Sequence, residues 1–303
     1  MDNYLNLIKQ SFTHEIPPCQ DPSNKDEWAR FGFYTAYHLY HLIMKQRFDL
    51  DKLERTTKAD GSPTTTLEFE MEKFARLALR RFYEPAVFLG EESGGGGDDS
   101  VYTDQYLFVI DPIDGTRSFL SGFETYSITL SVIKNRIPYF SLVCSPSSGD
   151  MYFRVGSKKS MVLQIPSTKK KLRLHSIPLF SRSAERPVLV NLHPSKNAIP
   201  ILHKLHDLWR KGEVALVKSV SGSPSLLMVE AAKTDTFYIN AWDSGPTRPY
   251  DLMPALHIVN ASNCVAVDRN KEHVDVWKHQ GIYVVGPRGD QLNQLLQRIF
   301  AFG

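Results

Sequence analysis

The stretch Tyr106-Leu107-Phe108-Val109-Ile110-Asp111-Pro112-Ile113-Asp114-Gly115-Thr116 decides the fold of this chain. Its first part, Tyr106–Ile110, predicts a buried strand that ends at Asp111-Pro112. A strand that ends in a carboxylate places that carboxylate at the edge of a sheet, where α/β proteins usually bind ligands. Pro112 fixes one backbone dihedral angle, so the side chains of Asp111 and Asp114 are held in a short, stiff turn.

The oxygen atoms of this turn are suited to a hard divalent cation. Two carboxylates and a backbone carbonyl favour Mg²⁺ over zinc or copper. Gly115-Thr116 then allows the backbone to approach an anion closely, and N–H groups there can hold a phosphate. An Asp-Pro turn followed by a helix cap explains the same six residues without any ligand, and the motif alone leaves the two interpretations level.

Two further acidic segments follow the same logic. Gly90-Glu91-Glu92-Ser93 comes after the short apolar run Ala86–Leu89, a candidate buried strand. Tyr250-Asp251 precedes an apolar helix, whose N-cap Asp251 could be. Taken singly, each segment is better explained as a solvated loop or a cap than as a metal ligand.

The pattern along the chain predicts an α/β fold made of two halves. Residues 1–24 show little periodicity and are expected to be a partly ordered lead-in. Residues 26–48 and the segment that follows Thr65 or Thr66 have helical spacing, and β-rich segments including the hairpin of residues 126–144 follow. From about residue 180, strands and helices alternate. We therefore expect an α+β half over residues 1–180 and an α/β half over residues 181–303.

The composition limits the classes of partner that this chain is expected to bind. The net charge of +3 over 303 residues is weak, and basic clusters such as Lys169-Lys170-Lys171 lack interleaved aromatic residues, so no nucleic-acid polymer is expected. No apolar run approaches the roughly 20 residues that span a bilayer, and no signal peptide is apparent, so no membrane contact is expected. Three scattered cysteines suggest neither a disulfide framework nor a thiolate metal site, which favours the cytoplasm.

Together, these segments resemble the inositol monophosphatase superfamily, the lithium-sensitive, Mg²⁺-dependent phosphatases that include the bisphosphate nucleotidases. The Gly-Glu-Glu, the Asp-Pro-Ile-Asp-Gly-Thr and the aromatic-Asp pair at a helix start occur in the family's order, with Tyr250 where Trp is usual. Lys58–Pro63 and Gly222-Ser223 also match family segments. The resemblance covers residues 58 to 268. It implies a layered α-β-α-β-α sandwich like that of the sugar phosphatases, and it allows a homodimer.

The resemblance also implies a ligand set for two or three Mg²⁺ ions. Glu91, Asp111 and the Ile113 carbonyl would hold one ion, and Asp111, Asp114 and Asp251 would hold a second. Two such ions can stabilise both the attacking and the leaving oxygen of an in-line displacement.

The chain departs from the family at the residue that orients the attacking water. Members usually carry Thr-x-x-Asp, and here the run is Thr65-Thr66-Leu67-Glu68, so Glu68 would act with Thr116. Glu92 has no role in this mapping and is expected to be a surface charge. Glu72, one turn beyond Glu68, is expected to be a helix-surface partner for a cation.

The predicted function is therefore hydrolysis of a phosphate monoester of a small metabolite, such as an inositol or sugar phosphate. Gly115, Thr116, Asp243 and Arg248 are the candidate substrate contacts. Two alternatives stay open. The Lys58–Pro63 opening leans towards a 3′(2′),5′-bisphosphate nucleotidase, and Glu68 in place of Asp allows a non-catalytic protein that binds Mg²⁺ and a phosphorylated ligand.

Overall fold

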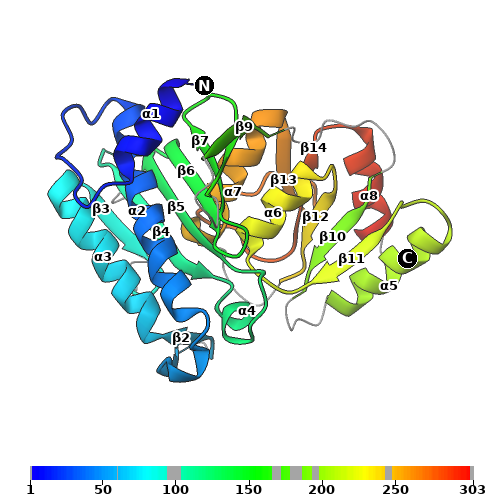
Figure 1. Cartoon of the computed structure of the whole chain (residues 1–303). Coiled ribbons are helices and arrows are strands. Elements are labelled where there is room, and N and C mark those ends of the chain that lie inside the picture. Colours follow the sequence, from blue (N-terminus) through cyan, green and yellow to red (C-terminus); the bar gives the residue numbers. More distant parts are fainter. Residues whose placement is uncertain are drawn as a thin grey trace.

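The chain folds into five layers (Figure 1), in a computed structural model that describes residues 2–59, 61–93, 104–165, 172–177, 186–192, 198–242 and 248–300. Helices α1, α2 and α3 cover one face of a seven-stranded sheet, and α6 and α7 lie between this sheet and a five-stranded one. Helices α5 and α8 cover the far face of the smaller sheet. The predicted α-β-α-β-α sandwich is confirmed.

The helices and strands have the following bounds. The helices are α1 (Asp2–Ser11), α2 (Lys25–Gln46), α3 (Thr66–Phe82), α4 (Thr116–Leu120), α5 (Ala198–Arg210), α6 (Pro224–Lys233), α7 (Pro249–Val259) and α8 (Asp290–Phe300). The strands are β1 (Arg55–Thr57), β2 (Pro63–Thr65), β3 (Val87–Gly90), β4 (Leu107–Asp114), β5 (Ser127–Lys134), β6 (Ile137–Ser145), β7 (Asp150–Val155), β8 (Met161–Gln164), β9 (Arg173–Ser176), β10 (Val188–Asn191), β11 (Val217–Val220), β12 (Phe237–Asn240), β13 (Cys264–Asp268) and β14 (Tyr283–Pro287).

Strand β4 carries the motif that opened the sequence. It pairs in parallel with β3 and antiparallel with β5, and it runs on to Asp114 instead of ending at Asp111 as predicted. The register with β5 shifts between Asp111 and Asp114. Pro112 has no N–H to donate to a ladder, and an irregularity of this kind is one of the few places where a sheet accepts proline.

The smaller sheet has the strand order β11-β10-β12-β14-β13. Strands β10, β11 and β12 are parallel, so their carboxyl ends meet at one edge of the sheet. The predicted boundary near residue 180 falls between the last strand of the larger sheet and the first of the smaller one. The division of the chain into two domains remains a prediction.

Helix α1 corrects the expectation of a partly ordered lead-in. It packs against α2 and buries Ile8 completely. Just beyond the helix, the ring of Phe12 stacks on that of Tyr37 with centroids 4.1 Å apart. Tyr4, Leu5, Ile8 and Phe12 recur at steps of three and four residues, so the helical signal was present but short.

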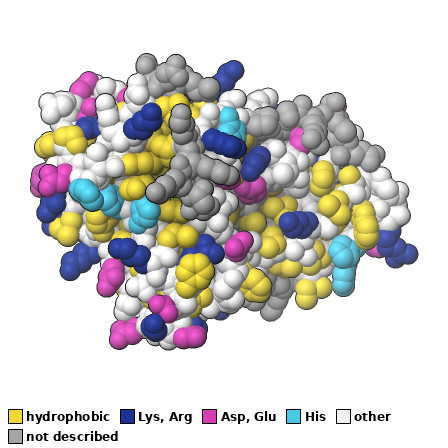
Figure 2. All heavy atoms as spheres, viewed as in Figure 1, with side chains coloured by type: hydrophobic (Ala, Val, Ile, Leu, Met, Phe, Trp, Pro, Cys, Tyr) yellow, Lys and Arg dark blue, Asp and Glu magenta, His cyan; other side chains and the backbone are white. Residues whose placement is uncertain are grey.

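Among the described residues, no helix combines the length and the apolar character needed to cross a bilayer. On the face shown in Figure 2, basic and acidic side chains are interspersed.

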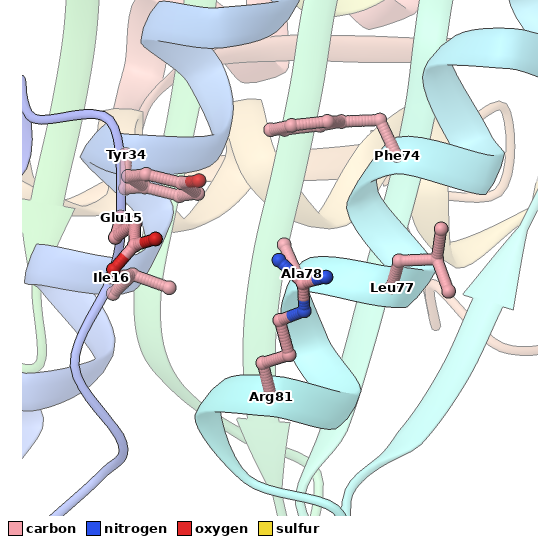
Figure 3. A pocket seen from close by; sticks show the side chains of 7 residues that line it. All are labelled: Glu15, Ile16, Tyr34, Phe74, Leu77, Ala78 and Arg81. Carbon is pink, nitrogen blue, oxygen red and sulfur yellow. The ribbon is translucent and has the colours of Figure 1, made fainter.

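A hollow of about 340 Å³ lies between the segment after α1, α2 and the C-terminal half of α3 (Figure 3). Its lining residues are Glu15, Ile16, Tyr34, Phe74, Leu77, Ala78 and Arg81. None of the predicted site residues is among them.

His257 is a buried ionisable group that fastens α7 to the larger sheet. Its Nδ1 lies 2.9 Å from Ser141 Oγ and its Nε2 lies 2.8 Å from the Gly156 carbonyl oxygen. The carbonyl can only accept, so Nε2 carries the proton and Nδ1 accepts from the Ser141 hydroxyl. Burial lowers the pKa of His257 to about 4.

This pKa predicts a loss of stability in acid. Between about pH 6.5 and pH 4, the unfolded His257 takes up a proton that the folded protein does not, so the free energy of unfolding falls as the pH falls. The contribution is about 3 kcal/mol over this window. Urea unfolding at several pH values should show a steeper acid loss for the wild type than for His257→Gln. The exposed His203 offers the control His203→Gln, which should keep the wild-type slope. Equal slopes for all three proteins would contradict the prediction.

Candidate metal-binding active site

Three carboxylates converge beside the motif strand. Among the described residues, one oxygen each from Glu91, Asp111 and Asp251 lies within 4.8 Å of the other two. Asp111 is buried, whereas Glu91 and Asp251 are partly exposed, so the group opens towards solvent. The group combines members of the two predicted ligand sets, which share Asp111.

The pairing of β3 with β4 places the first two carboxylates. Gly90 lies opposite Ile110 in the parallel register, and the Glu91 N–H donates to the Ile110 carbonyl at 3.2 Å. Glu91, the residue after β3, and Asp111, within β4, therefore lie side by side at the carboxyl end of β3. The carboxylates meet at the end of β3, although Asp111 does not end its own strand as predicted.

Asp251 reaches the group from the other side of the layer. It is the third residue of α7, not the N-cap that the sequence also allowed, and its Oδ2 accepts the Arg248 N–H at 2.9 Å. The start of α7 is fixed by two hydroxyls, since Thr129 donates to the Tyr250 carbonyl and Ser225 donates to the Asp251 carbonyl. Asp251 thus supports the first turn of α7 while its carboxylate takes part in the acidic group.

Asp114 is held by the segment that precedes and opens α6. Its Oδ2 accepts the Ser223 hydroxyl and, at 3.2 Å, the Ser225 N–H. Gly115, next in the motif, has φ of 92°, and a Cβ there would lie 2.8 Å from the Ser223 nitrogen. Only glycine allows this backbone conformation and this close approach together. The Gly-Ser segment noted in the sequence therefore abuts the motif directly.

The acidic group is electrostatically unfavourable as it stands. Burial, then the charges of Glu91 and Asp114, raises the pKa of Asp111 well above its usual value. Burial and the charge of Glu91 do the same to the pKa of Asp251, and burial raises that of Asp114 to about 7. A dense set of oxygen donors that resist ionisation is what a divalent cation stabilises, and the all-oxygen donor set fits Mg²⁺.

Lys58 supplies a positive charge at the rim of this site. Its Nζ lies 2.6 Å from an oxygen of Glu91 and 2.6 Å from one of Glu92, at the turn between β1 and β2. Burial opposes the charged form of Lys58, but the interactions with Glu91 and Glu92 outweigh it and raise its pKa. The Glu92 side chain is only 1% exposed, so the expectation that it is a surface charge was wrong.

Glu68 and Thr116 meet as the resemblance implied. The Thr116 hydroxyl oxygen lies 2.8 Å from Glu68 Oε1 and 3.1 Å from the Ile113 carbonyl oxygen. Glu68 Oε2 accepts the Thr65 N–H at 2.6 Å, and the Thr65 hydroxyl oxygen accepts the Glu68 N–H at 3.4 Å, which together form a capping box at the start of α3. The Thr65 hydroxyl also lies 2.8 Å from Oε2. One oxygen of Glu68 thus caps the helix and the other faces Thr116. Burial and the charge of Glu92 raise the pKa of Glu68 to about 7.

The remaining predicted residues have mixed outcomes. Arg248 is exposed just before α7, and Asp243 lies outside the described residues. Glu72 is not a helix-surface residue: it is 3% exposed, and its carboxylate accepts the N–H groups of Glu92 and Ser93. The sequence could have indicated this, because Glu72 lies one turn beyond Glu68 on the same helix face.

Sequence reasoning missed the support supplied by the smaller sheet. Asn191, the last residue of β10, is fully buried, and its side chain both donates to the Gly222 carbonyl and accepts the Gly222 N–H. A polar residue at the carboxyl end of a predicted parallel strand was the available signal.

Comparison with known proteins gives a family match over most of the chain. The model of the inositol monophosphatase family matches residues 24–299. Inositol monophosphatase 1 of Bos taurus is 27% identical over 255 residues, which cover 74% of this chain and 87% of the relative.

Two solved structures share the fold. The extragenic suppressor protein SuhB of Bartonella henselae has a TM-score of 0.69 at 15% identity, covering 90% of this chain and 98% of its own. Staphylococcal inositol monophosphatase-1, solved as an inhibitory complex after a soak in 100 mM LiCl, has a TM-score of 0.69 at 15% identity, covering 92% and 97%. The family match extends over most of the sequence, and we conclude that this chain belongs to the inositol monophosphatase family.

Proposed function

We propose that this chain is a Mg²⁺-dependent phosphatase that hydrolyses a phosphate monoester of a small metabolite, an inositol or sugar phosphate, in the cytoplasm. The observation that carries the proposal is the convergence of Glu91, Asp111 and Asp251 next to a Glu68–Thr116 pair. The relatives named as inositol monophosphatases support the substrate class.

The donor atoms for Mg²⁺ are the carboxylates of Glu91, Asp111, Asp114 and Asp251 and the carbonyl oxygen of Ile113, enough for two or three ions. Bound there, Mg²⁺ would neutralise charge on the phosphate oxygens and lower the pKa of a water molecule. The chain itself brings mainly negative charge to the site, so without a cation it would repel a phosphate ester.

Glu68 and Thr116 are proposed to orient the attacking water. Oε1 of Glu68 faces the Thr116 hydroxyl, and a water beside this pair can donate a proton to the carboxylate. The capping contacts of Oε2 restrict the carboxylate to one orientation, which is what a precise attack requires. The longer side chain of Glu is accommodated because its second oxygen is used by the helix. This favours catalysis over the non-catalytic alternative.

Metal dependence is the first test of this proposal. Phosphate release from a panel of inositol phosphates, sugar phosphates and adenosine bisphosphate should require Mg²⁺, stop in a chelator and resume when Mg²⁺ is returned. Saturating Mg²⁺ should also raise the melting temperature by roughly 5 °C, because the ion binds only the folded chain. Lithium should inhibit. Turnover that persists in chelator, or that only zinc restores, would count against the proposed site.

Asp251→Asn separates a metal ligand from a helix cap. The Asn oxygen can still accept the Arg248 N–H, and the substitution removes one of the mutually repelling charges, so the metal-free variant should be more stable by about 1 kcal/mol. It should lose most of its stabilisation by Mg²⁺ and roughly 100-fold or more in turnover. Thermal melts with and without Mg²⁺ measure the stability effects and a phosphate-release assay measures turnover, with the exposed Asp207→Asn on α5 as the control. If the Asp251→Asn variant were active and still stabilised by Mg²⁺, Asp251 would only support the start of α7 and would not be a metal ligand.

Glu68→Gln tests the proton acceptor. The amide oxygen can keep the cap with the Thr65 N–H, so the fold should survive, whereas kcat should fall roughly 10²- to 10⁴-fold with little change in KM. Glu68→Asp keeps the charge but cannot reach both partners, so it should lose about tenfold, less than Glu68→Gln. Steady-state kinetics decides, with the exposed Glu70→Gln on the same helix as the control. A Glu68→Gln protein as active as the wild type would assign the base elsewhere.

A further inference from the structure

Gly90 and Glu72 form a contact that no side chain other than glycine's hydrogen would allow. A Cβ built on Gly90 would lie 2.4 Å from the carboxyl carbon of Glu72 and 2.4 and 2.5 Å from its two oxygens. Real Cβ atoms do not approach other heavy atoms this closely. Gly90 is an ordinary β3 residue, so the lack of a side chain, and not an unusual backbone angle, is what the position requires.

The carboxylate of Glu72 lies over the end of β3 and binds the turn that follows. One oxygen accepts the Glu92 N–H at 2.6 Å and the other accepts the Ser93 N–H at 3.1 Å. These two N–H groups immediately follow Glu91, the proposed metal ligand on this turn. Bonds to an ionised acceptor are about twice as strong as neutral ones, and both are made by a side chain that is 3% exposed.

Helix α3 holds the backbone of Glu72 in a fixed position. Glu68 and Glu72 stand one turn apart on the same face of α3, and both are buried. Helix α3 packs against β3 and β4 (Figure 1). The neighbouring Met71 and Ala75 are fully buried, which locks the helix in place. The same helix face therefore carries the proposed proton acceptor and a carboxylate that holds the turn next to it.

We infer that Glu72, seated against Gly90, is a positioning residue that fixes the Glu91–Ser93 turn so that the Glu91 carboxylate is held ready for Mg²⁺. The inference rests on the proposed function, because it assigns Glu91 to the metal. Glu72 acts through the backbone: its own oxygens are occupied by N–H groups. Partners that orient a metal ligand in this way typically change metal affinity by 10- to 100-fold when they are removed.

Two substitutions distinguish the effect of the position of the Glu72 carboxylate from the effect of its charge. Glu72→Gln removes the charge and leaves one oxygen for two N–H donors, whereas Gly90→Ala keeps the charge and displaces the carboxylate. We expect each to weaken Mg²⁺ binding, measured by titration calorimetry, by roughly 10- to 100-fold. The Mg²⁺ concentration for half-maximal phosphate release should rise in parallel, while kcat at saturating Mg²⁺ stays within about threefold of the wild type. The double variant with Glu72→Gln and Gly90→Ala should bind Mg²⁺ only slightly more weakly than either single variant, because both substitutions remove the same contact.

Amide hydrogen exchange supplies a readout that needs neither metal nor substrate. In the metal-free protein, the Glu92 and Ser93 amides should exchange at least about tenfold faster in both variants than in the wild type, and the control Glu70→Gln should match the wild type. Unchanged exchange overturns the inference, whatever the activity. Weaker Mg²⁺ binding by Glu72→Gln together with unchanged Mg²⁺ binding by Gly90→Ala also overturns the inference, because the charge of Glu72, and not its position, would then determine the affinity. Wild-type protein that binds no Mg²⁺, yet shows the expected exchange, would refute the proposed function and leave the contact standing.

Discussion

The parallel pairing of β3 with β4 is the constraint on which the site depends. Its register places Gly90 opposite Ile110, so the residues that follow, Glu91 and Asp111, lie side by side where β3 ends. Burial of Asp111, and then the repulsion between these two carboxylates, raise the pKa of Asp111 well above its usual value. The other elements around this edge either add negative charge to it, as α7 does with Asp251, or limit its freedom, as Lys58 does by pairing with Glu91.

The two sheets contribute to the site in different ways. The larger sheet and α3 supply Glu91, Asp111, Asp114 and Glu68 directly. The smaller sheet acts at a distance, because the amide of Asn191 fastens both backbone groups of Gly222, and the next residue, Ser223, donates to Asp114. Ser127 of β5 lies 2.8 Å from the same Ser223 hydroxyl. A change in the smaller sheet can therefore reach Asp114 through the contact of Asn191 with Gly222, the peptide bond from Gly222 to Ser223 and the hydrogen bond from Ser223 to Asp114.

Much of this arrangement could be predicted from the sequence, for reasons of local chemistry. The strands and the layered fold follow from periodicity and from the resemblance, and the meeting of Glu68 with Thr116 follows from matching segments. What escaped prediction depends on contacts between distant segments. Glu92 has the sequence pattern of a loop charge, and only the fold places Lys58 on it. Burial of Glu72 depends on the missing side chain of Gly90. The extension of β4 past Pro112 depends on an irregular register with β5 that no local pattern specifies.

Because the Glu68 carboxylate contacts two partners, it limits which substitutions the sequence can accept around it during evolution. Its Oε2 depends on Thr65 and its Oε1 faces Thr116, so the start of a helix and the orientation of a water molecule rest on one side chain. A chain that lost the Thr65 hydroxyl would loosen both at once. A chain that shortened Glu68 would have to give up one partner or move the backbone of α3. Because family members with Thr-x-x-Asp keep the threonine at position 65, an exchange of Glu68 for Asp is expected to be accommodated by a shift of the α3 backbone, while Thr65 and Thr116 stay as they are.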